Sequence, residues 1–281
     1  MFYNLEATNF CNLQCKSCPT RLNLRPKGYM KPETFRSIIN QMLAGRDGFN
    51  RDRVVMHGYG EVLLSPYFFE NLDYLQSKGF VNVDFSDNCM LMTEEIVRKL
   101  CSYTCINYIK LSLNSSRKEL MERINTGSDF DKVVKNIQMI CDVVKECGSP
   151  FKIQVQLMHT NLNLDERPQE VKDLIGRDNF DVLECQIMSM LGMDKDNELL
   201  VPNSCFWNGE CVFAQVSMMF HWDGDIVGCC VDNTKSQLIG NEKDGIFSKE
   251  VQDKIKQFRE ELQNNDYSNL PACARCEGKK K

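Results

Sequence analysis

Short apolar runs and longer segments of helical periodicity alternate along the first 200 residues of the chain. Six strand-like runs occupy residues 2–7, 53–57, 81–85, 106–113, 151–158 and 181–188. Apolar positions recur at a helical period in residues 32–43, 66–77, 94–101, 130–147 and 164–175. Pro32 and Thr93 supply helix-start signals. Alternation of this kind predicts a parallel sheet with helical crossovers, an α/β fold.

The pattern changes near residue 200. Residues 212–220 and 225–231 read as two strands joined by a turn at Asp223 and Gly224. A charged helix over residues 248–263 and a short loop around residues 271–276 follow. The chain therefore divides into a larger domain, residues 1–200, and a small hairpin-plus-helix domain, residues 201–281.

Three cysteines follow the first predicted strand at the spacing C-x3-C-x2-C: Cys11, Cys15 and Cys18. Three closely spaced thiolates can hold three irons of a [4Fe–4S] cube and leave the fourth iron without a protein ligand. An open metal position is typical of a catalytic site. The alternatives are a zinc knuckle short of one ligand, or three unrelated core cysteines.

Four more cysteines form a second candidate metal site: Cys211, Cys229, Cys273 and Cys276. Four thiolates from separate elements can hold zinc or an iron–sulfur cluster. A zinc ribbon would use two C-x2-C knuckles, and only one is present. The main alternative has Cys205 or Cys230 in place of one of the four ligands.

These motifs resemble the radical S-adenosylmethionine (radical SAM) superfamily over most of the chain. The resemblance implies a partial (β/α)6 barrel and a [4Fe–4S] cluster whose open iron binds S-adenosylmethionine (AdoMet). Reduction then yields methionine and a 5′-deoxyadenosyl radical that abstracts a hydrogen atom. The C-terminal segment resembles the auxiliary-cluster domains called twitch and SPASM. The chain ends five residues after Cys276, which favours the short twitch form with one auxiliary [4Fe–4S] cluster.

Further residues match the AdoMet-binding motifs of the superfamily. The run from Gly58 to Glu61 resembles the Gly-Gly-Glu-Pro motif, whose carboxylate binds the AdoMet ammonium. The implied cofactor contacts are Gly58, Tyr59, Gly60, Glu61, Ser86, Asn88, Ser112 and Asn114. Three positions depart from the family pattern: Ser17 replaces an aromatic residue, Val62 replaces proline, and Cys89 occupies a glycine position.

Composition excludes several other classes of protein. The net charge of −5 argues against non-specific nucleic-acid binding. No apolar stretch approaches the roughly 20 residues of a membrane span, and the N-terminus carries no signal-peptide pattern. Fifteen cysteines, an odd number, fit a reducing compartment better than a disulfide framework. We expect a cytoplasmic protein without membrane or nucleic-acid partners.

Three functions are compatible with these features. The first is modification of a small polar molecule such as an aminocyclitol or sugar. An alcohol carbon is oxidised there with the auxiliary cluster as electron acceptor, or epimerised with Cys89, Cys205 or Cys230 as hydrogen donor. The second is modification of a peptide or protein. The third is a non-catalytic iron–sulfur carrier, which the open-iron motif and Glu61 disfavour. The two catalytic functions need an external electron donor such as flavodoxin or ferredoxin.

Overall fold

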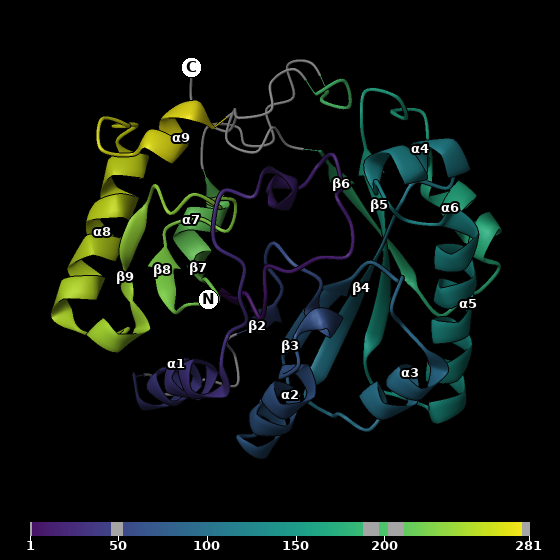
Figure 1. Cartoon of the computed structure of the whole chain (residues 1–281), viewed down its shortest axis with the longest axis horizontal. Coiled ribbons are helices and arrows are strands. Elements are labelled where there is room, and N and C mark those ends of the chain that lie inside the picture. Colours follow the sequence, from purple (N-terminus) through teal and green to yellow (C-terminus); the bar gives the residue numbers. More distant parts are fainter. Residues whose placement is uncertain (1, 46–52, 188–196, 202–210, 277–281) are drawn as a thin grey trace.

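The computed structural model describes residues 2–45, 53–187, 197–201 and 211–276. Nine strands form one sheet in the order β6-β5-β4-β3-β2-β1-β7-β8-β9 (Figure 1). Neighbours among β1 to β6 pair in parallel, which confirms the predicted barrel-like α/β core. These strands are β1 (Phe2–Leu5), β2 (Arg53–Met56), β3 (Val83–Asp87), β4 (Ile106–Asn114), β5 (Lys152–His159) and β6 (Asp181–Gln186).

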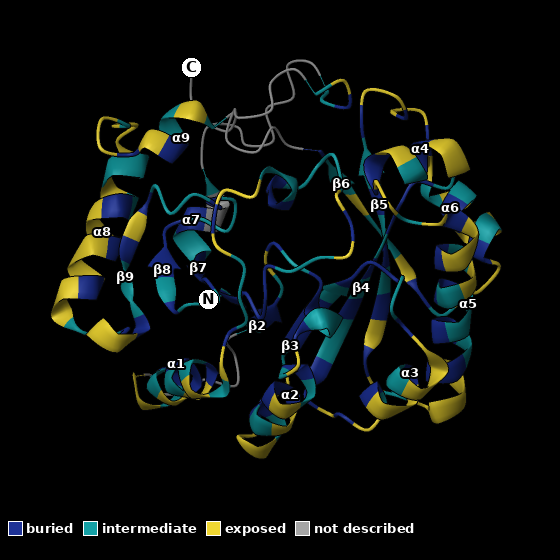
Figure 2. Cartoon of the chain, viewed as in Figure 1, coloured by how far each residue is buried: buried dark blue, intermediate teal, exposed yellow. Residues whose placement is uncertain are grey.

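Helices connect successive parallel strands and cover the outer face of the sheet (Figure 1). They are α1 (Pro32–Gly45), α2 (Phe68–Ser77), α3 (Glu94–Leu100), α4 (Lys118–Ile124), α5 (Phe130–Cys147) and α6 (Pro168–Ile175). Each turns an apolar stripe toward the sheet, so buried residues line the strand–helix boundary (Figure 2). Asp129 caps α5 through the Lys132 N–H at 3.0 Å, and Gly148 ends it in a left-handed conformation.

The C-terminal segment continues the same sheet. Strand β7 (Ser217–Phe220) lies parallel to β1, and β8 (Asp225–Val227) and β9 (Leu238–Asn241) follow antiparallel. The predicted turn at Asp223 and Gly224 joins β7 to β8. Helices α7 (Val212–Val216), α8 (Lys249–Gln263) and α9 (Pro271–Arg275) complete this part of the molecule. The hairpin and its helix are thereby attached directly to the barrel.

Several predicted elements were wrong in part. Residues 212–216 are helical, and only Ser217–Phe220 forms the strand expected over 212–220. Helix α6 begins at Pro168 instead of residue 164, because residues 160–166 form a hydrogen-bonded polar loop and proline suits the first helical position. Helix α4, strand β9 and helix α9 were not predicted. No helix of the described residues is long and apolar enough to cross a membrane.

Candidate active site

The loop after β1 carries Cys11, Cys15 and Cys18 at the C-terminal edge of the parallel sheet. All three thiols are partly buried. Burial, with added repulsion from the neighbouring thiols, raises the pKa of Cys11 to about 11 and of Cys15 to about 12. Three thiolates placed this close stay ionised together only beside a strong positive charge. The loop therefore suits a cationic metal group.

A close approach of two loops fixes this segment. A Cβ atom on Gly60 would lie 2.3 Å from the carbonyl oxygen of Thr8 and 2.7 Å from that of Phe10. The Glu61 N–H donates to the same Phe10 oxygen at 2.8 Å. Only glycine permits this contact, so Gly60 holds the loop after β2 against the cysteine loop.

Glu61 forms a buried carboxyl pair with Asp87. Its side chain accepts from the main-chain N–H groups of Asn88 at 3.0 Å and Leu63 at 3.3 Å. Asp87 accepts from the Cys89 N–H at 2.6 Å. Burial raises the pKa of both carboxyls, and the two side chains are close enough to interact directly. No lysine or arginine of the described residues forms an ion pair with either, so a cation from outside the chain would complete the site.

Cys89 follows this pair in a left-handed backbone conformation, with φ of +62°. That conformation costs a non-glycine residue roughly 1–2 kcal/mol, which explains why glycine is usual at this turn. The thiol is fully buried in the main hydrophobic core, and burial raises its pKa well above the ordinary value. This position favours a packing role for Cys89. The hydroxyl oxygen of Ser86, three residues before Cys89, lies 3.3 Å from Nδ1 of His57.

The end of β4 presents an unsatisfied acceptor. Asn114 adopts a φ of +68° and donates through Nδ2 to Asn125 at 2.6 Å. Its Oδ1 atom is buried without a hydrogen-bond partner. The Ser112 carbonyl accepts from Asn125 at 2.9 Å. A buried acceptor without a donor is costly, so a ligand hydroxyl would suit this position.

Four cysteines converge in the C-terminal segment. Cys211 precedes α7, Cys229 follows β8, Cys273 lies in α9 and Cys276 ends it. The pKa of Cys273 is raised first by burial and then by the nearby Cys229, Cys276 and Cys211 thiols. The fold therefore brings together the four residues that the sequence grouped.

The two substitute ligands are placed differently. Cys230 has its thiol hydrogen-bonded to that of Cys229, whereas Cys205 lies outside the described residues. Within the described ranges, no three cysteine, histidine or acidic side chains converge tightly enough for a single metal ion. A cubane cluster takes each thiolate on a different iron, so it suits the wider arrangement better.

Comparison with known families assigns the fold. The family model described as the Radical SAM superfamily matches residues 5–174. The chain belongs to the radical SAM superfamily. A second model, SPASM, described as an iron–sulfur cluster-binding domain, matches residues 211–277. The protein is therefore a radical SAM enzyme with a C-terminal cluster-binding domain, and its cofactors are AdoMet and [4Fe–4S] clusters.

Individual relatives of this radical SAM enzyme are distant. A probable GTP 3′,8-cyclase of Methanocaldococcus jannaschii is 25% identical over 159 residues, which is 56% of this chain and 50% of that protein. The chain thus spans about half the length of that curated relative. The crystal structure of BtrN with AdoMet and 2-DOIA has a TM-score of 0.66 at 14% identity, over 98% of this chain and 92% of that one. Native anSMEcpe with bound AdoMet has a TM-score of 0.67 at 18% identity, over 100% and 91%. At these identities the structures support the fold alone.

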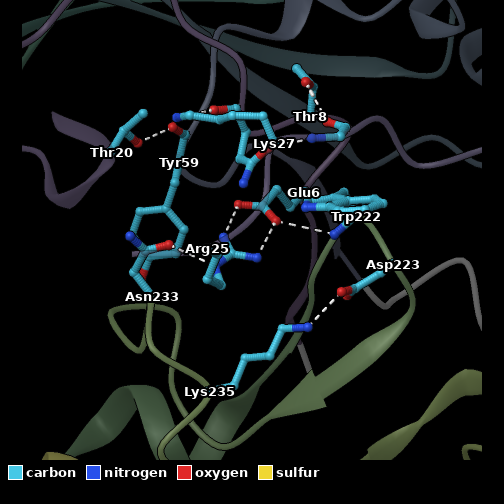
Figure 3. A network of polar contacts seen from close by, with 12 residues as sticks. Glu6, Thr8, Thr20, Arg25, Lys27, Tyr59, Trp222, Asp223, Asn233 and Lys235 are labelled. Atoms are coloured by element: carbon cyan, nitrogen blue, oxygen red, sulfur yellow. Dashed lines mark hydrogen bonds and ion pairs between the residues drawn. The ribbon is translucent and has the colours of Figure 1, made fainter. Parts of the chain in front are cut away.

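Buried polar contacts connect the two cysteine-bearing segments of this radical SAM enzyme (Figure 3). Glu6, directly after β1, forms a two-point ion pair with Arg25 at 2.6 and 3.1 Å. Arg25 also donates to Asn233 at 2.9 Å, and the Trp222 N–H donates to Glu6 at 3.1 Å. Both Glu6 and Arg25 are buried. The cysteine loop is thereby attached to the C-terminal segment by charge-assisted hydrogen bonds.

Tyr59 forms a second connection between the two segments. Its main-chain oxygen accepts from the Thr20 hydroxyl, which lies 3.2 Å from the Cys18 thiol. Its phenol donates to the Cys230 carbonyl at 2.6 Å. The main chain of Tyr59 therefore lies beside the first cysteine loop, while its side chain reaches the C-terminal segment.

Four residues of these contacts were not predicted from the sequence: Glu6, Arg25, Asn233 and Asp87. One signal was available, because Glu6 is a charged residue within the apolar run of residues 2–7. Charged residues in such positions are rarely buried without a partner. The partners themselves could not be identified, since Arg25 lies 19 residues from Glu6 and Asn233 lies 208 residues from Arg25.

Proposed function

We propose that this enzyme oxidises an alcohol carbon of a small, polar, polyhydroxylated substrate to a carbonyl. Cys11, Cys15 and Cys18 would hold the cluster that binds AdoMet. One auxiliary [4Fe–4S] cluster would be held by Cys211, Cys229, Cys273 and Cys276. The observation that carries the proposal is the convergence of those last four thiols, because full thiolate ligation suits electron acceptance. Residues 1–200 and 201–281 would form the two functional domains.

The chain's own residues would bind and orient AdoMet. The Glu61 and Asp87 carboxyls would accept its ammonium, which supplies the missing cation. Asn114 Oδ1 would accept a ribose hydroxyl, with Ser112 beside it. The remaining predicted contacts would shape the pocket by holding the loops together: Gly58, the Tyr59 main chain, Gly60, Ser86 and Asn88. When bound, AdoMet and the first cluster supply a 5′-deoxyadenosyl radical that removes one hydrogen atom from the substrate.

The oxidation removes two hydrogen atoms from the substrate in separate steps. The alcohol carbon loses one hydrogen atom to the nucleoside, the hydroxyl loses a proton to water, and one electron remains to be accepted. A cluster with four thiolate ligands has no open iron, so electron acceptance is the chemistry it would supply there. Flavodoxin or ferredoxin would deliver the electron that starts each turnover.

An epimerase is the second candidate within the same class. It would need a thiol to return a hydrogen atom to the substrate carbon. The Cys230 thiol hydrogen-bonds Cys229 beside the auxiliary site, whereas Cys89 is buried in the main core. Cys205 lies outside the described residues. Among the described thiols, Cys230 is therefore the one best placed to donate hydrogen.

Peptide modification is the third candidate. One structure of anSMEcpe carries AdoMet and a peptide named Cp18Cys, with a TM-score of 0.65 at 18% identity, and the BtrN structure carries 2-DOIA. This chain covers more than nine-tenths of each of these two proteins, so its length does not favour a peptide substrate over a small molecule. We favour the small substrate because short polar side chains, His57 and Ser86, lie together at the adjoining strands β2 and β3. Such groups suit an enclosed polar molecule.

Product analysis in D2O tests the proposal. Reconstituted enzyme, dithionite and AdoMet are incubated with candidate polyhydroxylated rings, and the products are examined by mass spectrometry and NMR. The oxidation predicts a carbonyl, a mass loss of two hydrogens and no carbon-bound deuterium. One non-exchanging deuterium on carbon would contradict it and support the epimerase.

A further inference from the structure

The interior wall of the barrel carries a lysine with no partner among the described residues. Ile109 and Leu111 are buried in the core beneath the helices. Because side chains alternate along a strand, Lys110 between them faces the opposite, interior side. The register places Ser86 of β3 and Gln154 of β5 beside it.

The charge of Lys110 is not neutralised by the described part of the chain, where it forms no ion pair or hydrogen bond. Arg53, whose positive charge acts on Lys110, is already paired with Asp84. Burial and Arg53 lower the pKa of Lys110 to about 8, so it is still largely protonated at neutral pH. A partly buried ammonium without a counter-ion is unfavourable.

Apart from the Arg53–Asp84 ion pair, the groups around Lys110 are neutral and polar. Burial, with the positive charges of Lys110 and Arg53, lowers the pKa of His57 to about 3, so its ring is uncharged. Gln154 makes no side-chain hydrogen bond with the described residues. This wall therefore offers one positive charge and several hydrogen-bonding groups.

We propose that Lys110 anchors a carboxylate or phosphate group of a molecule bound inside the barrel. The inference rests on the proposed function and narrows its substrate class to a polyhydroxylated ring that carries an acid group. The proposal disfavours an aminocyclitol as substrate, because Lys110 would repel its ammonium group.

Two molecules could supply that anion: the substrate, or AdoMet through its own carboxylate. Lys110 precedes Ser112 by two residues, which places its backbone about 7 Å deeper in the barrel. Among the residues assigned to AdoMet, Glu61, Asn88 and Asn114 lie at or just beyond the strand ends, and Ser86 is level with Lys110. This depth favours the substrate as the source.

Two variants isolate the charge. Lys110→Met removes the ammonium and keeps the apolar stem. Lys152→Met is the matched control, because Lys152 is exposed at the start of β5 and lies over the Tyr108 ring. Removal of an unpaired buried charge should raise the unfolding midpoint of the ligand-free Lys110→Met protein. A lower midpoint would mean that Lys110 has a partner within the chain, and would overturn the proposal.

Ligand probes then identify the anion. Glucuronate, glucose and glucosamine share one ring and differ in charge, and inorganic phosphate is added as a separate probe at constant ionic strength. Glucuronate or phosphate should raise the unfolding midpoint of AdoMet-loaded wild type and Lys152→Met, but not of Lys110→Met. No rise in wild type, or an equal rise in Lys110→Met, would overturn the anion site.

Calorimetry with AdoMet and decarboxylated AdoMet distinguishes the two sources. A substrate site predicts the same AdoMet affinity in wild type and Lys110→Met within about twofold. If Lys110→Met alone loses a preference for AdoMet over its decarboxylated form, the substrate assignment is overturned. Dithionite-dependent release of 5′-deoxyadenosine from wild type is measured in parallel. Its absence would refute the proposed function, whereas the ligand-binding results would still test the anion site.

Discussion

Glu61 and Asp87 are the residues on which AdoMet binding most directly depends. Both are buried, and neither pairs with a cation of the described chain. Glu61→Gln keeps the shape and removes the charge. A hydrogen bond to a charged group contributes about 1.5–3 kcal/mol, so AdoMet affinity should fall about ten- to a hundredfold in calorimetry. Glu242→Gln, at a buried glutamate that accepts from Ser37, is the control. Equal affinities in all three proteins would exclude Glu61 from the ammonium site.

The same pair predicts a pH dependence of stability in the absence of AdoMet. Burial raises the pKa of Asp87 above 3.8 and of Glu61 above 4.5. The free energy that the two protonated carboxyls contribute to folding is therefore fully present below these ordinary pKa values. It is lost as pH rises through the raised pKa values of the folded protein. Asp87→Asn removes one of the two titrating carboxyls. Relative to wild type, the variant should gain stability as pH rises above these ordinary values, measured by urea unfolding. A difference that does not change with pH would mean that the pKa of Asp87 is not raised in the folded protein.

The C-terminal elements matter because each brings one part of the auxiliary site. Cys229 follows β8, while Cys273 and Cys276 belong to α9 and its end. Changing Cys273 and Cys276 to Ala should remove the auxiliary cluster, or about four irons, and keep the first cluster. Iron analysis measures the loss, and Cys141→Ala, at a buried core thiol, is the control. Full iron content in the double variant would contradict the ligand assignment.

The sequence predicted elements best where the pattern was long. Residues 130–147 form α5 with the predicted bounds. A run of 18 residues with a helical period and a capping residue at each end is too long to be read as a strand. Short runs were less informative. The apolar residues 212–220 fit a helix or a strand equally well, and β9 contains only four residues, one of them Gly240.

At the scale of the whole molecule, the Glu6–Arg25 pair holds the cysteine loop to the C-terminal segment. Arg25→Met leaves Glu6 buried without its cation. Breaking a buried pair in this way costs about 3–5 kcal/mol of unfolding free energy, measured by urea unfolding. Lys254→Met, at an exposed ion pair with Glu250, should cost far less, because exposed ion pairs contribute little to stability. Similar losses in the two variants would contradict a specific role for the buried pair.

The candidate site was only partly predictable. Cys11, Cys15 and Cys18 share one loop, so their spacing carried the information. Other groups of the site come from different strands and loops: Glu61 with Asp87, Glu6 with Arg25, and Lys110 with His57. Their contacts depend on strand register and on packing across the sheet, which one sequence without its fold does not specify.

We propose that two separate cysteine sets hold two clusters and that only the first cleaves AdoMet. The most direct measurement is iron content together with 5′-deoxyadenosine formation in reconstituted wild type and in the triple Ala variant of Cys11, Cys15 and Cys18. We predict about eight irons in wild type and about four in the variant, with 5′-deoxyadenosine formed by wild type alone. Zinc as the dominant metal, full iron content in the variant, or 5′-deoxyadenosine formation by the variant would contradict the account.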